Sequence, residues 1–427
     1  MKRDSRPGVC IIVENQPVPF DRRVWQEARA LLAAGYRVSI ISPKAPGCEA
    51  SEETRDGIEI YRHWVWGGRR RVGYIFEYGF ALVAEFCLAW KVYARSRFSI
   101  LQGCNPPDTI FLIALAFKPL GVRFVFDHHD LSPELYEAKF EKRGLIYKIV
   151  RLAERLTFRV ADLSIATNGS YKKIAIERGK MKPEQVLVVQ TCEDQSEVNR
   201  VRQRPELKRG KRNMVLYVGI MERQDGVRLL IESIEYLVKQ KGRKDTQFVL
   251  VGSGTELPGL KKLATESGVD DFVEFTGLLP HEQVGAYMAT ADVCVAPDPL
   301  NPLNNKSTMI KILEYMAYGR PIVLYELEEG RRTAGEGALY ARPNDATDFA
   351  NQIEKLLDSG ELRRSLGEFG RKRTEEELNW KVQSARLVGA YASLVAPSEL
   401  PPESNPAKSL NREIEEESEV HYTTKQT

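Results

Sequence analysis

A lysine and a glutamate lie near the start of a predicted helix that follows a polar loop rich in proline and asparagine. Ser307 or Thr308 can cap this helix, which we expect to run to about Tyr318. The free N–H groups and the positive dipole at its start favour a bound phosphate. Lys311 and Glu314 are three residues apart, so both lie on one helix face. They could hold a diphosphate and a sugar hydroxyl, or they could belong to a ring of surface charge around an ordinary helix.

Two of the chain's five histidines are adjacent at the end of another predicted strand. The apolar run 122–126 leads directly into Asp127, His128, His129 and Asp130. Neighbouring side chains of a strand point to opposite faces, so the two imidazoles are not expected to bind one metal ion. We expect one histidine to face a binding cleft and the other to be structural. Because the chain also lacks an Asp-x-Asp pair, the sequence predicts no bound metal.

A third group of candidates lies in the loop 14–21, which follows the first predicted strand. Asp21 can cap the helix that begins at Arg22. In an open parallel sheet, ligands bind beyond the carboxyl ends of the strands. Asn15, Arg22 and Arg23 are therefore candidates for binding a phosphate or an acceptor, although a capped turn with solvated arginines explains the same residues.

Short apolar runs alternate with amphipathic segments along the chain, as they do in open parallel α/β sheets. At 427 residues the chain is too long for one typical core, and the alternation occurs twice. A polar, basic segment separates the two halves. We predict an N-terminal domain, a linker, a C-terminal domain, a helix that returns to the N-terminal domain and a disordered tail, with the bounds 1–198, 199–212, 213–379, 380–396 and 397–427.

Composition narrows the range of partners and compartments. The net charge of +3 is too small to indicate nucleic acid as a partner. The six cysteines show no Cys-x-x-Cys spacing, which fits reduced thiols in a cytoplasmic protein, and we expect no secretory signal. Charges interrupt the apolar segment 74–94, so we expect a packed helix and not a membrane span. Together with Arg69, Arg70 and Arg71, this segment could still touch a membrane surface.

The segment LEYMAYGRPIV, residues 313–323, resembles the signature helix of family-4 retaining glycosyltransferases, which have the α/β GT-B fold. Similar blocks run from VENQPVPFDRRVW to NWKVQSARLVGAYASL, so the resemblance covers almost the whole chain. It implies two Rossmann-like domains facing each other across a cleft. It also implies that Glu314 binds the donor ribose, and that the helix start with Ser307, Thr308 and Lys311 holds the nucleotide diphosphate.

The family pattern Glu-x7-Glu is altered, because Lys306 stands eight residues before Glu314. The resemblance implies an acid at this position that reads donor hydroxyls, whereas a lysine offers only hydrogen-bond donors and a charge. We expect Lys306 to suit a donor with an acceptor-rich group, such as a carboxylate or an acetamido carbonyl. In the other interpretation, the loop turns Lys306 into solvent and Asn304 or Asn305 replaces it.

The segment VFDHHDLSPE, residues 125–134, resembles the strand-end histidine of the same family, which an acidic residue follows. By this match His129 and Asp130 are the catalytic pair near the donor sugar, and His128 is the fallback. TGLLPHEQV resembles the loop whose backbone contacts the base, around Leu278.

The segment YVGIMERQDGV resembles the loop in which relatives place an arginine and a lysine on the diphosphate. Asp225 occupies the lysine position here, and Arg223 is displaced by a few residues. Arg223 is therefore a candidate diphosphate ligand, and a strand-to-helix turn capped by Asp225 is the alternative.

The resemblance implies a retaining, metal-independent hexosyltransferase that takes a nucleotide sugar, with a UDP-sugar as the expected donor and no cofactor. The acceptor would be a glycan or a lipid-linked glycan in cell-surface polysaccharide synthesis. The protein would be cytoplasmic, with peripheral membrane contact and no nucleic-acid partner. A sugar-nucleotide epimerase or a glycan phosphorylase of the same fold is an alternative, as is a non-catalytic protein that binds glycans or nucleotide sugars.

Overall fold

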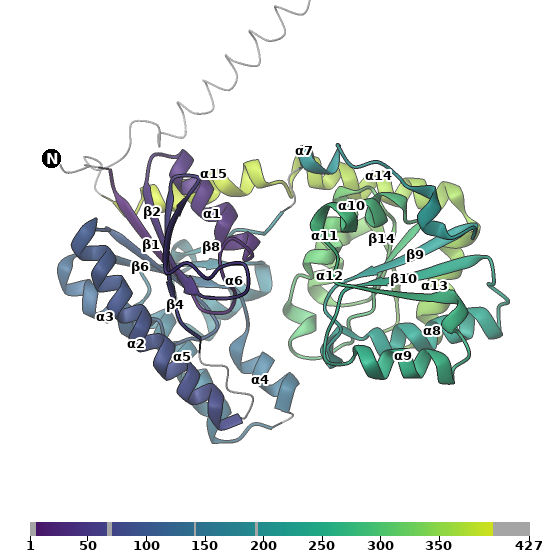
Figure 1. The fold of residues 1–427 in the computed structure, drawn as a ribbon, viewed down its shortest axis with the longest axis horizontal. Helices are drawn as coiled ribbons and strands as arrows, with labels where there is room; N and C mark the ends of the chain where they lie inside the picture. Colours follow the sequence, from purple (N-terminus) through teal and green to yellow (C-terminus); the bar gives the residue numbers. More distant parts are fainter. Residues whose placement is uncertain (1–5, 66–70, 141, 193–194, 396–427) are drawn as a thin grey trace, which may run out of the picture. The chain divides into compact units, whose positions relative to one another are not determined.

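The computed structural model describes residues 6–65, 71–140, 142–192 and 195–395 (Figure 1). Contacts divide the chain into two compact units. The first unit holds the described residues up to Glu137, those from 142 to Val189, and those from Gln383 onward. The second unit holds Ala138–Phe140 and the described part of Gln190–Val382. Arg69, Arg70 and the predicted disordered tail 397–427 lie outside the described residues.

The first unit is built on an eight-stranded sheet with the order β3-β4-β2-β1-β5-β6-β7-β8. All neighbours pair in parallel except β3, which runs antiparallel to β4 at one edge. The strands span Gly8–Val13, Arg37–Pro43, Glu52–Arg55, Ile58–His63, Ile100–Cys104, Arg123–His128, Leu163–Ala166 and Val186–Val188, from β1 to β8. Every residue of β1 and β5 is buried, as expected for central parallel strands covered on both faces.

Helices of the first unit connect these strands and cover the sheet (Figure 1). They are α1 Arg22–Ala33, α2 Arg71–Arg95, α3 Phe111–Phe117, α5 Leu145–Val160, α6 Gly169–Glu177 and the greater parts of α4 Ser132–Phe140 and α15 Trp380–Ala392. The predicted cap of α1 is confirmed, since Asp21 Oδ1 accepts a hydrogen bond of 3.0 Å from the Val24 N–H. Among the described residues no helix, α2 included, is long and apolar enough to cross a membrane.

The second unit has a six-stranded, all-parallel sheet with the order β11-β10-β9-β12-β13-β14. Its strands span Asn213–Val218, Thr246–Val251, Val273–Gly277, Val293–Ala296, Ile322–Tyr325 and Ala338–Ala341, from β9 to β14. Its helices are α7 Gln195–Val198, α8 Val227–Lys239, α9 Leu257–Glu266, α10 His281–Thr290, α11 Ile310–Ala317, α12 Glu328–Ala334, α13 Ala346–Asp358 and α14 Gly360–Glu376. One apolar cluster lies on each face of this sheet. The prediction of two Rossmann-like α/β units is confirmed.

Two glycines let the backbone pack tightly at the carboxyl edge of the second sheet. Gly252 follows β10 with φ +136°, and a Cβ on it would lie 1.9 Å from the carbonyl oxygen of Gly219. Gly226 precedes α8 with φ +68°, and a Cβ on it would lie 2.0 Å from the carbonyl oxygen of Pro297. A side chain cannot fit at either place, so the turns after β9, β10 and β12 come close together.

The segment 199–212 differs from the predicted linker. Within it, Pro205–Lys208 forms a short 3-10 helix. The Arg204 N–H donates to Thr290 Oγ1 (2.8 Å), and Lys208 Nζ donates to Asp292 Oδ2 (2.7 Å). The segment is therefore part of the second unit, because its basic side chains and backbone find fixed partners on neighbouring strands and helices.

The predicted returning helix corresponds to α15. Its residues from Gln383 onward belong to the first unit. The Tyr391 hydroxyl donates to Gln102 Oε1 of β5, and the Tyr391 ring meets the ring of Tyr36 edge to face at a centroid distance of 6.4 Å.

Candidate functional site

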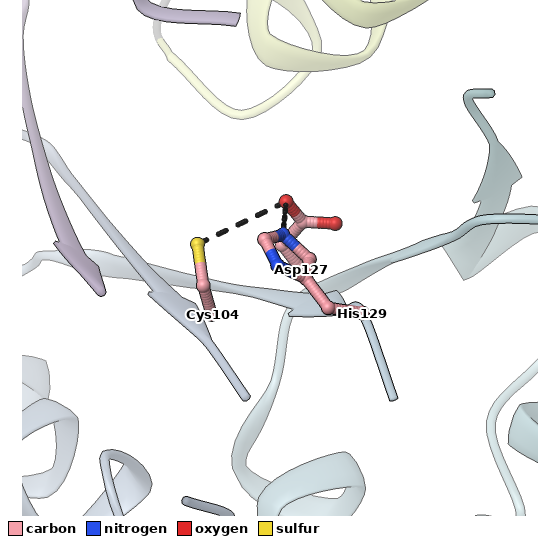
Figure 2. Close-up of side chains that lie close together, drawn as sticks. All are labelled: Cys104, Asp127 and His129. Carbon is pink, nitrogen blue, oxygen red and sulfur yellow. Dashed lines mark hydrogen bonds and ion pairs between the residues drawn. The ribbon is translucent and has the colours of Figure 1, made fainter. Parts of the chain in front are cut away.

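The strongest group of charges in the first unit surrounds Asp127, at the carboxyl end of β6 (Figure 2). Arg23 of α1 binds both oxygens of this carboxylate, with Nη2–Oδ1 at 2.7 Å and Nε–Oδ2 at 3.2 Å. His129 Nε2 lies 2.6 Å from Oδ2, and Gln102 Nε2 donates to Oδ2 at 3.1 Å. The Cys104 thiol is a weaker neighbour at 3.8 Å. Asp127 thus joins strands β5 and β6 to the first helix.

Arg23 was predicted to serve a phosphate or acceptor on the loop before α1, and the structure corrects this. Its side chain is only 7% exposed, and besides Asp127 it contacts Glu27 Oε1 (3.2 Å) and the carbonyl oxygen of Val189 (2.9 Å). The first turn of α1 directs Arg23 toward the sheet, so its charge is paired with acidic side chains inside the fold. The other two candidates, Asn15 and Arg22, are exposed.

The charge state of this cluster follows from burial and proximity. Burial raises the pKa of Asp127, but the charges of Arg23 and His129 outweigh it, so the pKa lies well below its ordinary value. Burial alone would lower the pKa of His129, but the Asp127 carboxylate raises it above its ordinary value. Burial and the charge of Asp127 raise the pKa of Glu27 to about 8. The raised pKa of Glu27 favours its neutral carboxyl group, and the raised pKa of His129 favours its charged imidazole.

The two adjacent histidines have different surroundings, as predicted. His128 is fully buried, and its ring packs against the rings of Phe126, Phe158 and Tyr171. Burial lowers its pKa to about 3, so it is neutral. The side chain of His129 is 13% exposed. Of this pair, only His129 can meet a ligand.

Asn105, which sequence reasoning missed, holds the turn after His128. Its Oδ1 accepts from the N–H groups of His129 (2.7 Å) and Asp130 (3.2 Å), and its Nδ2 donates to the Asp130 carbonyl at 2.7 Å. Burial raises the pKa of the half-buried Asp130 carboxyl. The signal in the sequence was the polar segment CNPPD, which directly follows a buried strand.

In the second unit, the start of α11 differs from the prediction. The helix begins at Ile310 after Met309, and neither Ser307 nor Thr308 occupies the cap position. Instead, Ser307 Oγ donates to the carbonyl of Leu303 at 2.9 Å, because a short 3-10 helix, Asn304–Lys306, precedes it. A local hydrogen bond to the preceding turn therefore replaces the expected helix cap.

Lys311 is turned inward and paired. Its Nζ lies 2.9 Å from Asp298 Oδ1 and 4.9 Å from the centre of the Tyr217 ring. Burial lowers its pKa, but Asp298 outweighs this effect and raises the pKa above its ordinary value. Burial raises the pKa of Asp225 to about 6, although Lys311 acts in the opposite direction. Lys311 thus places a positive charge beside the loop that holds Asp225. Glu314 is half-buried on the same helix.

The remaining predicted residues of the second unit differ in how exposed they are. Lys306 is half-buried, Arg223 is exposed in a 3-10 turn, and the side chain of Leu278 is 82% exposed. Asn304 is buried and ties two loops together, because its Nδ2 donates to the carbonyls of Gln224 (2.8 Å) and Pro299 (2.9 Å). Asp298 and Tyr217 were missed from the sequence, whereas Asn304 was named there only as a replacement for Lys306.

The turn before α8 also differs from the prediction. Asp225 does not cap α8, since its Oδ2 accepts from the N–H of Glu222 at 3.1 Å within the 3-10 turn. Gly226 takes the cap position.

Three side chains of the Asp127 cluster in the first unit have the chemistry of a metal site. The ligand atoms of Cys104, Asp127 and His129 all lie within 4.8 Å of one another (Figure 2). Arg23 already occupies both oxygens of Asp127, so a cation placed there would face a guanidinium. This arrangement favours a paired carboxylate over a metal centre.

Comparison with known families identifies the class of the chain. The family "Glycosyl transferase 4-like domain" matches residues 21–192, and the family "Glycosyl transferases group 1" matches residues 212–359. These matches fall on the two units and together span most of the chain. The chain belongs to the group-1 glycosyltransferases, also called glycosyltransferase family 4.

Among individual relatives, an alpha-D-kanosaminyltransferase of Streptomyces kanamyceticus is 30% identical over 43% of this chain and 46% of its own length. An MMP alpha-(1->4)-mannosyltransferase of Mycolicibacterium hassiacum is 26% identical over 63% of this chain and 64% of its own length. A lipopolysaccharide core biosynthesis glycosyltransferase of Rhizobium meliloti is 30% identical over 43% of this chain and 49% of its own length. The matched part therefore spans about half to two thirds of these relatives.

Solved structures confirm the GT-B fold. A sucrose-phosphate synthase from Thermosynechococcus elongatus is similar with a TM-score of 0.74 and 20% identity, covering 91% of this chain and 99% of that chain. HepE of Anabaena, solved in complex with UDP-glucose, has a TM-score of 0.65 and 13% identity, covering 90% of this chain and 99% of that chain.

The pairing of His129 with Asp127 makes a measurable prediction. Asp127→Asn should lower the pKa of His129 from above to below its ordinary value, because burial remains and the carboxylate charge is gone. Histidine-labelled NMR titration measures this, and His128→Gln assigns the neighbouring signal. Because the folded pKa of His129 is raised, its stabilising contribution is complete below about pH 6.5 and is lost as the pH rises through the folded pKa. An unchanged His129 pKa in Asp127→Asn would contradict the pairing.

Proposed function

We propose that this protein is a retaining glycosyltransferase that moves a hexosyl residue from a UDP-sugar to a glycan or a lipid-linked acceptor. We place the reaction in cell-surface polysaccharide synthesis at the cytoplasmic face of a membrane. The family membership of both units carries the proposal. The lipopolysaccharide-core relative and the UDP-glucose complex of HepE support the choice of acceptor class and donor. The six free cysteines fit a reducing compartment.

In this proposal the donor binds at the carboxyl edge of the second sheet, where α11 begins. The half-buried carboxylate of Glu314 accepts hydrogen bonds from the ribose hydroxyls, and N–H groups at the start of α11 face the diphosphate. Lys311 stabilises the leaving diphosphate while Asp298 holds its ammonium in place. Ser307, Thr308 and Arg223 stand near the diphosphate, and the exposed Leu278 backbone meets the base. These roles need no metal at the diphosphate.

His129 is the proposed catalytic group of the first unit, with Asp130 beside it. The Asp127 carboxylate orients its imidazole through the 2.6 Å contact and raises its pKa, which favours the charged form. A charged imidazole can stabilise the negative charge that develops on a departing phosphate or transfer a proton to it.

Product formation tests the proposal as a whole. The protein is incubated with single UDP-sugars and with soluble or lipid-linked glycan acceptors. UDP release should depend on the acceptor, and NMR should show that the product keeps the anomeric configuration of the donor. Donor binding without turnover would instead indicate a binding protein, and interconversion of donor sugars would indicate an epimerase.

Two variants should separate nucleotide recognition from sugar recognition. Glu314→Gln should weaken UDP and all UDP-sugars alike, because losing a charge-assisted bond costs about 1.5–3 kcal/mol. Lys306→Ala should leave UDP affinity unchanged and weaken only donors with a carboxylate or an acetamido group. Calorimetry with UDP and a donor panel, in EDTA and in Mg²⁺, measures both effects. Equal UDP affinity in wild type and Glu314→Gln would contradict the assignment of Glu314 to the ribose. If UDP bound only in the presence of Mg²⁺, the proposed metal independence would be wrong.

His129→Ala should lower turnover on the order of 100-fold while UDP affinity in the second unit is kept. In wild type, turnover should fall as the pH rises through the raised pKa of His129, since the charged imidazole is the active form. His128→Gln is the matched control, because that ring is buried and neutral. We expect this variant to lower the free energy of unfolding but to change the turnover of each folded molecule little. If the two variants had equal turnover, His129 would not be catalytic.

The membrane contact in this proposal involves one face of the first unit. Five apolar residues of α5 are exposed at helical spacing: Leu145, Ile146, Ile149, Leu152 and Leu156. Lys148, Arg151, Arg155 and Arg159 of the same helix are also exposed, whereas its one acid, Glu154, is buried. α3 contacts both α5 and α2 (Figure 1). α2 also has exposed apolar side chains, namely Phe80, Val83 and Trp90. An apolar face with basic neighbours fits an anionic lipid surface.

The protein should therefore co-sediment with phosphatidylglycerol vesicles, and less with phosphatidylcholine vesicles. The double variant Ile149→Glu, Leu152→Glu should reduce this binding at least roughly tenfold, because charge replaces buried apolar area. Leu300→Glu, at an exposed site in the second unit, is the control and should bind as wild type does. Equal binding by the double variant would exclude α5 as the contact.

A further inference from the structure

A second group of ionisable side chains lies in the first unit, apart from the Asp127 cluster. Glu14 directly follows β1, His63 ends β4, and Glu85 lies in the middle of α2. All three are buried, Glu85 to 1% exposure. Their nearest ligand atoms lie within 4.8 Å of one another. The fold thus brings together two carboxyl groups, from residues 71 apart in the chain, and one imidazole.

Two atoms of this group have no hydrogen-bond partner among the described residues. These are the two carboxyl oxygens of Glu85, which are both buried. Glu14 Oε2 and His63 Nε2 are also buried, and they lie 2.8 Å from each other. An unpaired buried polar atom typically costs about 1–3 kcal/mol, and a charged one costs more. The unpartnered carboxyl group of Glu85, beside the Glu14–His63 contact, indicates that something is bound there.

The orientation of His63 sharpens the argument. Its Nδ1 lies 3.2 Å from the carbonyl oxygen of Trp64, a geometry that assigns the proton to Nδ1. Nε2 lies 2.8 Å from Glu14 Oε2, on the side of the ring that faces the two carboxyl groups. A backbone carbonyl that fixes the far nitrogen is also the usual support of a metal-binding histidine.

The nearest described arginine does not pair with the two carboxyl groups. Arg62 is next to His63 in sequence, but its guanidinium donates to the carbonyls of Val18 (2.8 Å) and Ala50 (3.2 Å) and to Glu53 Oε1 (2.8 Å). The Cys104, Asp127 and His129 group differs, since Arg23 supplies its counter-charge.

We propose that Glu14, His63 and Glu85 bind one divalent transition-metal ion of the Zn²⁺ or Mn²⁺ class. One imidazole nitrogen and two carboxylates suit these ions, whereas Ca²⁺ and Mg²⁺ prefer oxygen ligands alone. The ion provides a partner for the two unpartnered oxygens of Glu85, and its binding releases any proton that the three ligands hold. It links the ends of β1 and β4 to α2 and so fixes the loop that begins at Glu14. This inference does not rest on the proposed function.

The test uses the full-length protein after treatment with a chelator. Wild type should bind one equivalent of Zn²⁺, with a rise in the thermal midpoint and with proton release seen by calorimetry in buffers of different ionisation enthalpy. Bound Co²⁺ should show visible d–d absorption bands. Glu85→Gln, which keeps the side-chain shape, should reduce Zn²⁺ affinity on the order of 100-fold or more. Mg²⁺ should produce none of these effects.

Two further variants make the outcome decisive. Glu14→Gln should behave as Glu85→Gln does, which provides a second variant should one fold poorly. Cys104→Ser should bind Zn²⁺ as wild type does. If wild type binds no more tightly than Glu85→Gln, the pair holds a shared proton and the proposal is overturned. Loss of binding in Cys104→Ser alone would place the ion in the other cluster and would also overturn it.

Discussion

The buried ion pair between Arg23 and Asp127 is the interaction on which the first unit depends. Through the arginine it joins α1 to the end of β6 and to the backbone at Val189, just after β8. Through Gln102 it reaches β5 and the hydroxyl of Tyr391 in α15. Breaking a pair of this kind by removing one partner costs about 3–5 kcal/mol, because the remaining charge stays buried. The same pair sets the charge of His129, so stability and the candidate chemistry have one origin.

The second unit repeats this principle with different residues. Lys311 and Asp298 form a buried pair at the carboxyl edge of its sheet, with Tyr217 beneath the ammonium. The glycines at 226 and 252 bring the surrounding turns close enough to exclude side chains. Lys311 thus provides a buried and paired positive charge that acts on the carboxyl group of Asp225 in the neighbouring loop.

Much of the fold could be predicted because strand and helix periodicities are strong and local. The alternation of buried strands with helices, the Asp21 cap and the separation of His128 from His129 all follow from rules that act over a few residues. The role of Arg23 could not be found this way, since its partner lies 104 residues away. The start of α11 was missed because Ser307 had a competing acceptor at Leu303. Likewise, the triad of Glu14, His63 and Glu85 has no spacing signal, because tertiary structure alone assembles it.

The contact of Tyr391 with Gln102 has a consequence for the order in which the chain can complete its structure during synthesis. The second unit draws its residues from positions before Gln383, so a ribosome exposes all of them before α15 has fully emerged. The first unit begins earlier but needs residues that follow the second unit, since Tyr391 packs beside Tyr36 and β5. The unit that is translated first is therefore completed after the second unit, and until then its sheet lacks one covering helix.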